Sequence, residues 1–363
     1  MSILFDKRVV MTLDAGGTNF VFSAMRGGRE IVEPIVIDAN ADNLQKCLDG
    51  ITNGFKTVKD HLNASPDAIS FAFPGPSDYE NGIIGDLGNL PGFRGGIPLG
   101  PMLNDIFQVP VFIRNDGDLF ALGEAVGGVL SDINNAMEIK GASKRYRNLV
   151  GITLGTGFGA GVVHKGEVLS GDNNLAAEIW NTSNAISSER NIEDGVSTRA
   201  IINEFEQAAG VKETGFMPAD IHRIAMTEDH AQRNAAQFAF ERFGLHLGDA
   251  ICNLISLFDS SVVMGGGITN AAPLFMPKVM EVLNGSFENG HKRLIHTASY
   301  LDSNDAFDEF LKHSSRQVKV PGSGRLVEYH EQIKVFVAKS KLGCSKAVAI
   351  GAYAYALNRL TEN

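Results

Sequence analysis

A short run of small and polar residues near the start of the chain has the composition of a phosphate-binding turn. Asp14-Ala15-Gly16-Gly17-Thr18-Asn19 separates two strand-like runs at residues 9–13 and 20–24. Two adjacent glycines let backbone N–H groups converge on an anion with no side chain in the way. Thr18 adds a hydroxyl donor, and the Asp14 carboxylate is suited to holding Mg²⁺ through water. The alternative is a plain hairpin, because many Gly-Gly turns only reverse the chain.

The same device recurs twice later in the chain. An apolar run at residues 148–154 leads into Gly155-Thr156-Gly157, and a third cluster, Gly265-Gly266-Gly267, follows the apolar run at 261–264. A glycine turn at the carboxyl end of a parallel strand is where open α/β sheets bind nucleotides. The repetition predicts two related lobes that each offer a phosphate-binding hairpin to a shared cleft.

Asp116 is the candidate general base. It follows the strand-like run 111–113 and opens the helix-like run 117–126, so its carboxylate is expected at a strand end. Phosphoryl transfer to an alcohol requires a positioned base that accepts the hydroxyl proton. The alternative is that Asp116 only caps a helix, a position that Asp prefers in any protein. The three glycine turns and the preceding Asn115 favour the catalytic role.

Together these motifs resemble the ROK family of sugar kinases and repressors, within the actin-like ATPase and sugar-kinase superfamily. The resemblance covers most of the chain, and the order and spacing of its motifs are highly specific. The matching segments are residues 14–19, 73–76, 89–92, 115–118, 123–125, 154–161, 177–179 and 265–268. The resemblance implies an α/β fold with two actin-like (ribonuclease H-like) lobes around a central cleft, and ATP-dependent phosphorylation of a hexose or N-acetylhexosamine.

The resemblance also suggests which residues bind each substrate. The phosphates of ATP-Mg²⁺ would lie on Gly16 to Asn19 and Gly155 to Gly157, and the adenosine near Gly265 to Gly267. Carboxylate and amide side chains discriminate sugar hydroxyls strongly, because an unmatched buried polar group is costly. The candidates for this role are Asn89, Asn115, Glu178, Asn181 and Glu193. Apart from Asn181, the alternative for each of them is a solvated loop residue.

The chain departs from the ROK pattern where the family usually carries a histidine and a cysteine-rich zinc knuckle. Asn181 stands at the histidine position, and residues 182–191 replace the knuckle. No cysteine or histidine lies between His164 and His222, so we expect no structural zinc in this segment. One sugar contact is changed, which leaves the identity of the sugar open, although Asn181 can still donate and accept hydrogen bonds.

Length and periodicity predict how the lobes are divided. A chain of 363 residues with 44% hydrophobic positions can build two substantial cores. We expect an N-terminal lobe at residues 1–125, joined by a C-terminal helix at 345–363, and a larger lobe at 126–344. An insertion around 286–341 either covers the core, which we favour, or forms a surface subdomain or partner contact. Apolar residues at helical spacing predict one helix over 44–58 and a long buried helix over 238–257.

Composition and charge limit which classes of binding partner and which cellular compartment we expect. The formal net charge of -10, without a run of Lys or Arg, argues against nucleic acid as the main partner. Three scattered cysteines fit reduced thiols, the first residues lack the features of a signal peptide, and no run approaches a membrane span. We expect a cytoplasmic enzyme with ATP and a small sugar as partners, no membrane association, and a homodimer left open.

Two other functions are alternatives to the kinase. A ROK-type repressor would need a helix-turn-helix domain ahead of the first glycine turn, where only residues 1–13 are present. A catalytically impaired sugar-sensing protein fits the missing histidine and knuckle. Retention of Asp14, Thr18 and Asp116 favours the kinase.

Overall fold

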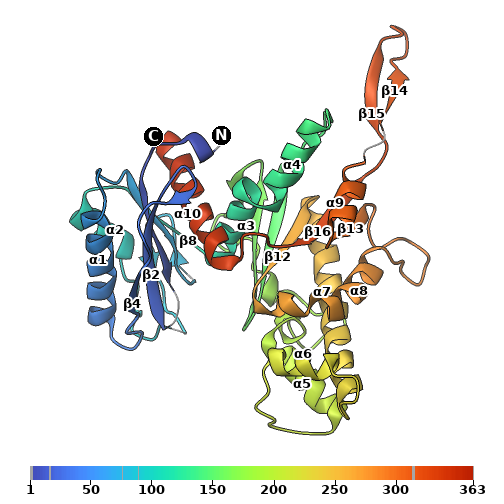
Figure 1. The fold of residues 1–363 in the computed structure, drawn as a ribbon, viewed down its shortest axis with the longest axis horizontal. Coiled ribbons are helices and arrows are strands. Elements are labelled where there is room, and N and C mark those ends of the chain that lie inside the picture. Colours follow the sequence, from blue (N-terminus) through green and yellow to red (C-terminus); the bar gives the residue numbers. More distant parts are fainter. Residues whose placement is uncertain (1–2, 16–17, 76, 89, 313–314, 363) are drawn as a thin grey trace. The chain divides into compact units, whose positions relative to one another are not determined.

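The computed structural model describes residues 3–15, 18–75, 77–88, 90–312 and 315–362. The chain divides into two compact units (Figure 1). Unit 1 comprises Met1–Asp132, Ala160–Ala177 and Lys341–Asn363, and unit 2 comprises Ile133–Gly159 and Glu178–Ser340. Both units combine helices with a largely buried sheet, so the predicted mixed α/β class is confirmed.

The sheet of unit 1 has the strand order β3-β2-β1-β5-β8, and β4 also pairs with β2. Its strands are β1 (Val10–Ala15), β2 (Asn19–Arg26), β3 (Arg29–Glu30), β4 (Ile35–Asp38), β5 (Ala68–Ala72) and β8 (Val111–Arg114). Strands β1 and β2 form an antiparallel hairpin, whereas β1, β5 and β8 run parallel. The carboxyl ends of these three strands therefore lie along one edge of the sheet.

Helix α1 (Leu44–Asp60) covers part of this sheet and matches the helix predicted over residues 44–58. The side chain of Asn43 caps it by accepting a hydrogen bond from the backbone N–H of Lys46 at 3.0 Å. Its buried face carries Phe55, whose ring packs edge-on against Phe22 of β2, with the ring centroids 5.1 Å apart. The smaller elements of this region are β6 (Ser77–Asp78), β7 (Ile83–Ile84) and α2 (Leu99–Phe107).

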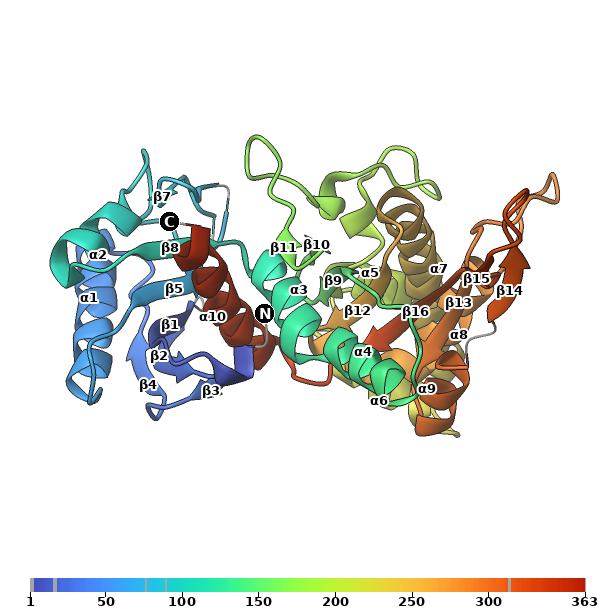
Figure 2. The same cartoon turned by 90° about the horizontal axis from the view of Figure 1, so that it is seen from above.

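Helices α3 (Asp116–Gly127) and α10 (Cys344–Glu362) lie side by side in unit 1 (Figures 1 and 2). Their backbones touch directly. A Cβ atom built on Gly123 would lie 1.9 Å from the carbonyl oxygen of Ala347, and one on Gly351 would lie 1.9 Å from that of Leu119. Only glycine fits at either crossing point. The short distance between the two helices therefore depends on glycine at both positions.

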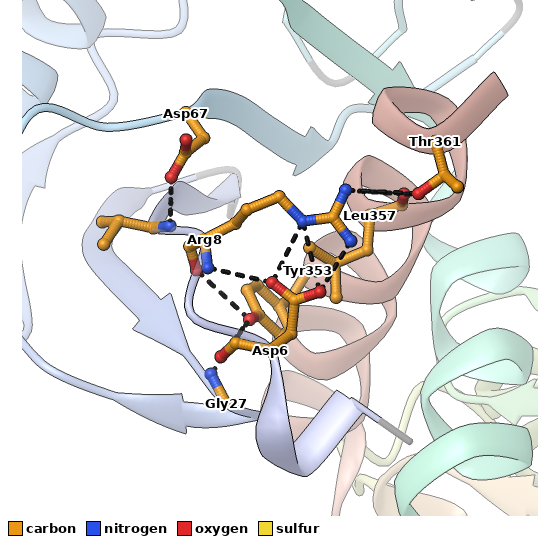
Figure 3. Close-up of polar contacts among 8 residues, drawn as sticks. Asp6, Arg8, Gly27, Asp67, Tyr353, Leu357 and Thr361 are labelled. Carbon is orange, nitrogen blue, oxygen red and sulfur yellow. Dashed lines mark hydrogen bonds and ion pairs between the residues drawn. The ribbon is translucent and has the colours of Figure 1, made fainter. Parts of the chain in front are cut away.

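Polar contacts fix α10 to the start of the chain (Figure 3). Arg8 pairs with Asp6 at 2.6 Å and donates to the carbonyl oxygen of Leu357 at 3.3 Å. The Tyr353 hydroxyl accepts from the backbone N–H of Gly27 at 2.9 Å and donates to the carbonyl oxygen of Arg8 at 3.2 Å. The C-terminal helix is thereby bound to both the first strand segment and the β2–β3 turn.

The core of unit 2 is a parallel sheet in which β9, β12, β16 and β13 are neighbours in that order. Helices pack around it, among them α7, which also contacts α5 and α8. The strands and helices concerned are β9 (Asn148–Leu154), β12 (Ser261–Gly265), β13 (Thr297–Leu301), β16 (Lys334–Lys339), α5 (Thr198–Ala209), α6 (Pro218–Met226), α7 (Arg233–Phe258) and α8 (Ala272–Leu283).

Helix α7 is the long helix predicted before the third glycine cluster, but its burial was predicted too broadly. Phe243 and Leu254 are buried, whereas Phe238 and Leu257 are 46% and 77% exposed. Apolar periodicity identifies the helix, but it does not say how far along its length neighbours cover it.

The remaining elements connect these layers. Segment 286–341 supplies β13 and β16 to the sheet of unit 2 and also forms α9 and a two-stranded ribbon of β14 and β15. The elements not yet described are α4 (Val129–Ile139), β10 (Phe158–His164), β11 (Glu167–Val168), α9 (Asn304–Phe310), β14 (Ser315–Lys319), β15 (Leu326–His330) and the 3₁₀ helices Ile3–Phe5, Ile179–Asn181, Ile192–Asp194 and Gly267–Ala271. Within the described residues, no helix is long and apolar enough to cross a membrane.

The glycine crossing gives a stability prediction. Gly123→Ala should lower the free energy of unfolding by about 1–3 kcal/mol or more, because the added methyl group collides with the α10 backbone. Urea titration followed by circular dichroism measures this change. Gly88→Ala is the control, since a Cβ atom there meets nothing within 4 Å. Equal stability of the Gly123 variant and wild type would show that the helices can separate at little cost.

Candidate active site

The predicted catalytic residues of unit 1 lie at the carboxyl edge of its sheet. Asp14 is near the end of β1, the segment Phe73-Pro74-Gly75 follows β5, and Asn115 and Asp116 follow β8. Because the three strands are parallel neighbours, all these residues reach the same edge. Asp14 also lines a pocket of about 550 Å³ formed by β1, β2, the β3 region and the start of α10.

The environment of Asp116 favours its protonated form. Burial raises the pKa of the Asp116 carboxyl above its ordinary value, and the negative charge of Asp14 raises it further. The backbone N–H of Gly117 donates to Asp116 Oδ1 at 2.9 Å, which acts in the opposite direction. Protein atoms desolvate the carboxyl, yet the residue remains exposed at the surface. Asp116 can therefore be reached from solvent and holds a proton more readily than an ordinary aspartate.

Asn115, rather than Asp116, is the N-cap of α3. Its Oδ1 accepts a hydrogen bond from the backbone N–H of Gly117 at 2.8 Å, and its φ and ψ are those of an extended residue. Asp116 is already the first residue of the helix. The capping role considered for Asp116 is therefore filled largely by Asn115. The Asp116 carboxylate lies in the first turn of α3, where the helix dipole stabilises negative charge.

A buried arginine lies beneath these two residues. Arg114 is 2% exposed and pairs with Asp118 of α3 at 2.6 Å. It also donates to Asn174 Oδ1 at 2.9 Å, and its guanidinium lies 5.5 Å from the ring centroid of Tyr79. One guanidinium thus joins the first turn of α3 to the β6 region and to the segment that precedes Glu178.

Unit 2 brings the other two glycine turns together. Strands β9 and β12 are parallel neighbours, and Thr153 is paired with Gly265. Gly266 has a φ of +96°, and a Cβ atom there would lie 2.1 Å from the carbonyl oxygen of Leu154. The close approach requires glycine at this position. The predicted phosphate turn at 155–157 and the predicted adenosine turn at 265–267 are therefore adjacent at one sheet edge.

Glu193 contacts the second glycine turn. Its Oε2 accepts a hydrogen bond from the backbone N–H of Phe158 at 3.0 Å, and a Cβ atom on Gly157 would lie 2.7 Å from the same oxygen. Gly155 is held from the other side, since the backbone N–H of Thr198 donates to its carbonyl oxygen at 2.8 Å. The sequence did not indicate this contact between Glu193 and the phosphate turn.

Glu178 precedes a single turn of 3₁₀ helix in unit 2, and Asn181 is the last residue of that turn. Both are exposed, and Glu178 accepts a hydrogen bond from the indole N–H of Trp180. The placement leaves both side chains accessible to a ligand. Thr18 and Asn19 are exposed at the start of β2 in unit 1, whereas Gly16, Gly17 and Asn89 lie outside the described residues.

A buried amide organises the segment where the family usually has its zinc knuckle. Asn184 is 2% exposed, and its Oδ1 accepts from the backbone N–H groups of Ile186 and Ser187 at 3.0 and 3.1 Å. Its Nδ2 donates to the carbonyl oxygen of Asn191 at 3.3 Å. The same side chain therefore closes the loop through hydrogen bonds. Across the part of the chain that the structure describes, no group of three or more His, Cys, Asp or Glu side chains could hold a metal ion.

Two of these features were missed at the level of sequence. Arg114 and Asp118 have the four-residue spacing of a helical ion pair, but Arg114 precedes the helix, so the pattern gave no clear signal. Asn184 is one of several polar residues in an irregular segment, and nothing in its neighbours marks it as buried. Both depend on contacts between segments that are distant in sequence.

The fold and these strand-end residues define a protein of the actin-like ATPase fold, with carboxylate and amide residues at the sheet edge of unit 1 and paired glycine turns in unit 2. Residues 10–307 match the ROK family, and the chain belongs to that family.

Known sugar kinases resemble the chain over most of its length. The crystal structure of a glucokinase from Parabacteroides distasonis is 46% identical, with a TM-score of 0.90 and coverage of 99% of both chains. A glucokinase from Halalkalibacterium halodurans is 26% identical over 74% of this chain and 83% of its own length. An N-acetyl-D-glucosamine kinase from Vibrio parahaemolyticus is 26% identical over 73% and 87%, respectively.

The arginine network predicts a specific kinetic defect. Arg114→Lys keeps a positive charge for Asp118 but cannot also reach Asn174 with a planar fork. We expect the KM for the acceptor sugar to rise by about tenfold to 10²-fold, since small displacements of positioning groups have effects of this size. The KM for ATP should stay close to wild type. Steady-state kinetics at varied sugar concentration and at varied ATP concentration measure the two KM values separately.

Arg293→Lys is the matched control, because Arg293 makes a comparable ion pair with Asp249 in unit 2. Thermal unfolding of both variants identifies any general loss of structure. An unchanged sugar KM in a folded Arg114→Lys enzyme would contradict the positioning role.

Proposed function

We propose that this chain transfers the γ-phosphate of ATP to a hydroxyl group of glucose, with Asp116 as the general base. Membership of the ROK family and the likeness to glucokinases make it an ATP-dependent carbohydrate kinase. The observation that carries the mechanistic part is the position of Asp116. It is an accessible carboxylate with a raised pKa, at the same sheet edge as Asp14 and the segment after β5.

Glucose is the favoured acceptor because of the degree of similarity. The glucokinase from P. distasonis shares 46% of its residues with the chain over nearly the whole of both, whereas the N-acetyl-D-glucosamine kinase shares 26% over a shorter region. A change of acceptor requires a different set of hydrogen-bonding and apolar contacts. The higher identity supports the same acceptor more strongly than it supports an N-acetylated sugar.

The residues of unit 1 would handle the acceptor. Asp116 would accept the proton of the attacking hydroxyl as the new bond to phosphorus forms. The pKa of Asp116 is raised towards neutral pH, which makes its carboxylate a stronger base than that of an ordinary aspartate. Asn115 uses its Oδ1 to cap α3, so its Nδ2 is the atom suited to donate to a sugar hydroxyl. Arg114 would orient both residues through the first turn of α3.

The residues of unit 2 would handle the nucleotide and part of the sugar. Backbone N–H groups of the 155–157 turn would bind phosphate oxygens, and the neighbouring turn at 265–267 would contact the adenosine. Glu193 supports the 155–157 turn by accepting from the N–H of Phe158 through Oε2. Its Oε1 lies 3.8 Å from the Arg199 guanidinium and would accept a hydrogen bond from a sugar hydroxyl as well. Glu178 and Asn181 are accessible and have the chemistry to bind further hydroxyls. In unit 1, Thr18 would add a hydroxyl donor, and the remaining assignments, Gly16, Gly17, Asn19 and Asn89, rest on sequence alone.

Magnesium fits the donor set of unit 1. Asp14 offers a single carboxylate, and Mg²⁺ in kinases is held by one or two carboxylates together with water and the substrate phosphates. When bound, the ion would neutralise charge on the phosphoryl oxygens. Asp14 would hold it, and the same negative charge contributes to the raised pKa of Asp116.

The competing function is sugar binding without phosphorylation. It is motivated by Asn181, which replaces the family's usual histidine, and by the loop at residues 182–191, which contains no cysteine or histidine and which Asn184 organises. A sensing protein would bind sugar with no need for a base at Asp116.

A turnover assay decides between the two functions. The purified chain should form ADP and sugar phosphate in equal amounts from ATP, Mg²⁺ and glucose, with a higher kcat/KM for glucose than for N-acetylglucosamine or mannose. Asp116→Asn keeps the shape and hydrogen bonding but cannot accept a proton. Its kcat should fall by about 10²- to 10⁴-fold, while glucose binding measured by calorimetry survives.

Asp105→Asn is the control, because Asp105 is exposed on α2 of the same unit and is not placed in the proposed site. Glucose binding by the wild type without any sugar phosphate would favour the sensing protein. Near-normal turnover of Asp116→Asn would remove Asp116 from the mechanism while leaving the kinase assignment intact.

A further inference from the structure

Trp180 is the single tryptophan of the chain, and it is the middle residue of the 3₁₀ turn Ile179–Asn181. It is 39% exposed, although tryptophan is highly buried on average in folded proteins. The uncovered ring is next in sequence to Asn181 and two residues after Glu178, both of which we assign to sugar hydroxyls. An apolar ring therefore stands open beside two polar side chains that have the chemistry to bind a sugar.

The turn that carries Trp180 is fixed from below. Ile179 is buried, and its carbonyl oxygen accepts from the backbone N–H of Thr182 at 3.0 Å and from the Thr182 hydroxyl at 2.9 Å. The carbonyl oxygen of Thr182 accepts in turn from the backbone N–H of Ile192 at 2.9 Å. The turn is thereby held by its buried residue and by the segment that follows it, while Trp180 remains on the solvent side.

The indole is fixed as well. Its N–H donates a hydrogen bond to Glu178 Oε2. This N–H is the only polar group of the side chain, so the hydrogen bond leaves no donor unsatisfied if a ligand covers the ring. In the described part of the chain, no residue hydrogen-bonds to the other oxygen, Glu178 Oε1. The contact places an apolar ring next to a carboxylate oxygen that is open to a ligand.

The same region of unit 2 contains the third proposed sugar ligand. The turn Ile192–Asp194 packs beside the turn of Trp180 and carries Glu193. Glu193 accepts from the backbone N–H of Phe158, at the end of the predicted phosphate turn. The indole thus belongs to a connected segment that holds candidate sugar ligands and reaches the turn proposed for the phosphates.

The surface of a hexose matches this combination of groups. Glucose in its chair form carries its hydroxyl groups around the edge of the ring and presents C–H groups on both faces. Carboxylates and amides bind the hydroxyls. The face of an aromatic ring carries negative potential, which attracts the polarised C–H hydrogens, and tryptophan offers a large rigid surface at a low cost in conformational entropy. A sugar is therefore bound best by polar groups at its edge and an aromatic ring on one face.

We propose that Trp180 is a further acceptor-binding residue, whose indole packs against one C–H face of the hexose while Glu178 and Asn181 bind hydroxyls at its edge. The inference rests on the proposed sugar-kinase function and deepens it, because it names a group that selects the shape of the acceptor. An axial hydroxyl on the contacted face would hold the sugar away from the ring. Trp180 therefore favours hexoses with a flat apolar face, such as glucose.

Tryptophan fluorescence tests the contact directly, since Trp180 is its only source in the chain. Addition of glucose without nucleotide should shift the emission to shorter wavelength as the indole is desolvated, with the same Kd that calorimetry gives. Glucose binding or turnover with unchanged emission would overturn the inference and leave the kinase assignment intact. An emission shift without turnover would remove the kinase function and support the contact. If glucose neither binds nor is phosphorylated, both proposals fail.

Substitution measures what the ring contributes. Trp180→Leu keeps an apolar side chain but lacks the flat ring. Its KM for glucose, and its Kd measured by calorimetry, should rise by about three- to tenfold. The KM for ATP and the kcat at saturating glucose should stay close to wild type. Trp180→Phe restores a ring and should recover most of the affinity.

Phe238→Leu is the matched control, because Phe238 is an exposed aromatic residue on α7 that is not placed in the proposed site. It should leave every constant unchanged, and thermal unfolding identifies any variant that is not folded. Unchanged glucose affinity in a folded Trp180→Leu protein would contradict the inference. An equal loss of ATP affinity would show that Trp180 is structural, which also contradicts it.

Two epimers of glucose test the selection of shape. Mannose carries an axial hydroxyl on one face of the ring, and allose carries one on the opposite face. Whichever face meets Trp180, one of the two epimers cannot pack against the indole. The ratio of its Kd to that of glucose should be smaller in Trp180→Leu than in wild type, while the ratio for the other epimer stays the same. Two unchanged ratios would overturn the proposed selection.

Discussion

The direct contact between the backbones of α3 and α10 is the constraint on which the catalytic arrangement of unit 1 depends. Gly123 and Gly351 allow each helix to approach the carbonyl oxygens of the other, and any side chain at these positions would force them apart. The first turn of α3 carries Asp116, so the position of the proposed base follows from this packing. Arg8 and Tyr353 then hold α10 against the first strand segment.

Both units use the same physical device to place functional groups. Parallel strands end at a common edge, and small residues in the turns beyond them leave backbone groups accessible. In unit 1 the edge presents carboxylates and amides, as at Asp14 and Asn115. In unit 2 it presents glycine backbone, and Gly266 is fixed by its close approach to Leu154. The proposed division of roles, with the acceptor at unit 1 and most of the nucleotide at unit 2, rests on which residue types occupy each edge.

Local signals accounted for the elements that the sequence predicted well. Asn43 caps α1, apolar spacing marks its buried face, and glycine clusters mark the ends of β9 and β12, all within short stretches of chain. The features that were missed depend on distant segments. Arg114 meets Asn174 sixty residues later, and Asn184 is buried within an irregular loop where neither periodicity nor composition distinguishes it.

A direct titration of the Asp116 carboxyl tests whether its surroundings tune it to accept a proton. The protein labelled with ¹³C at aspartate carboxyl carbons can be titrated by NMR, with the Asp116 signal assigned by its absence in Asp116→Asn. We expect a pKa above the ~3.9 of an unperturbed aspartate. The pKa should decrease in Asp14→Asn, because removal of the Asp14 charge removes one cause of the shift. A pKa at or below the ordinary value, or one indifferent to Asp14, would show that burial and Asp14 do not tune Asp116 as a base.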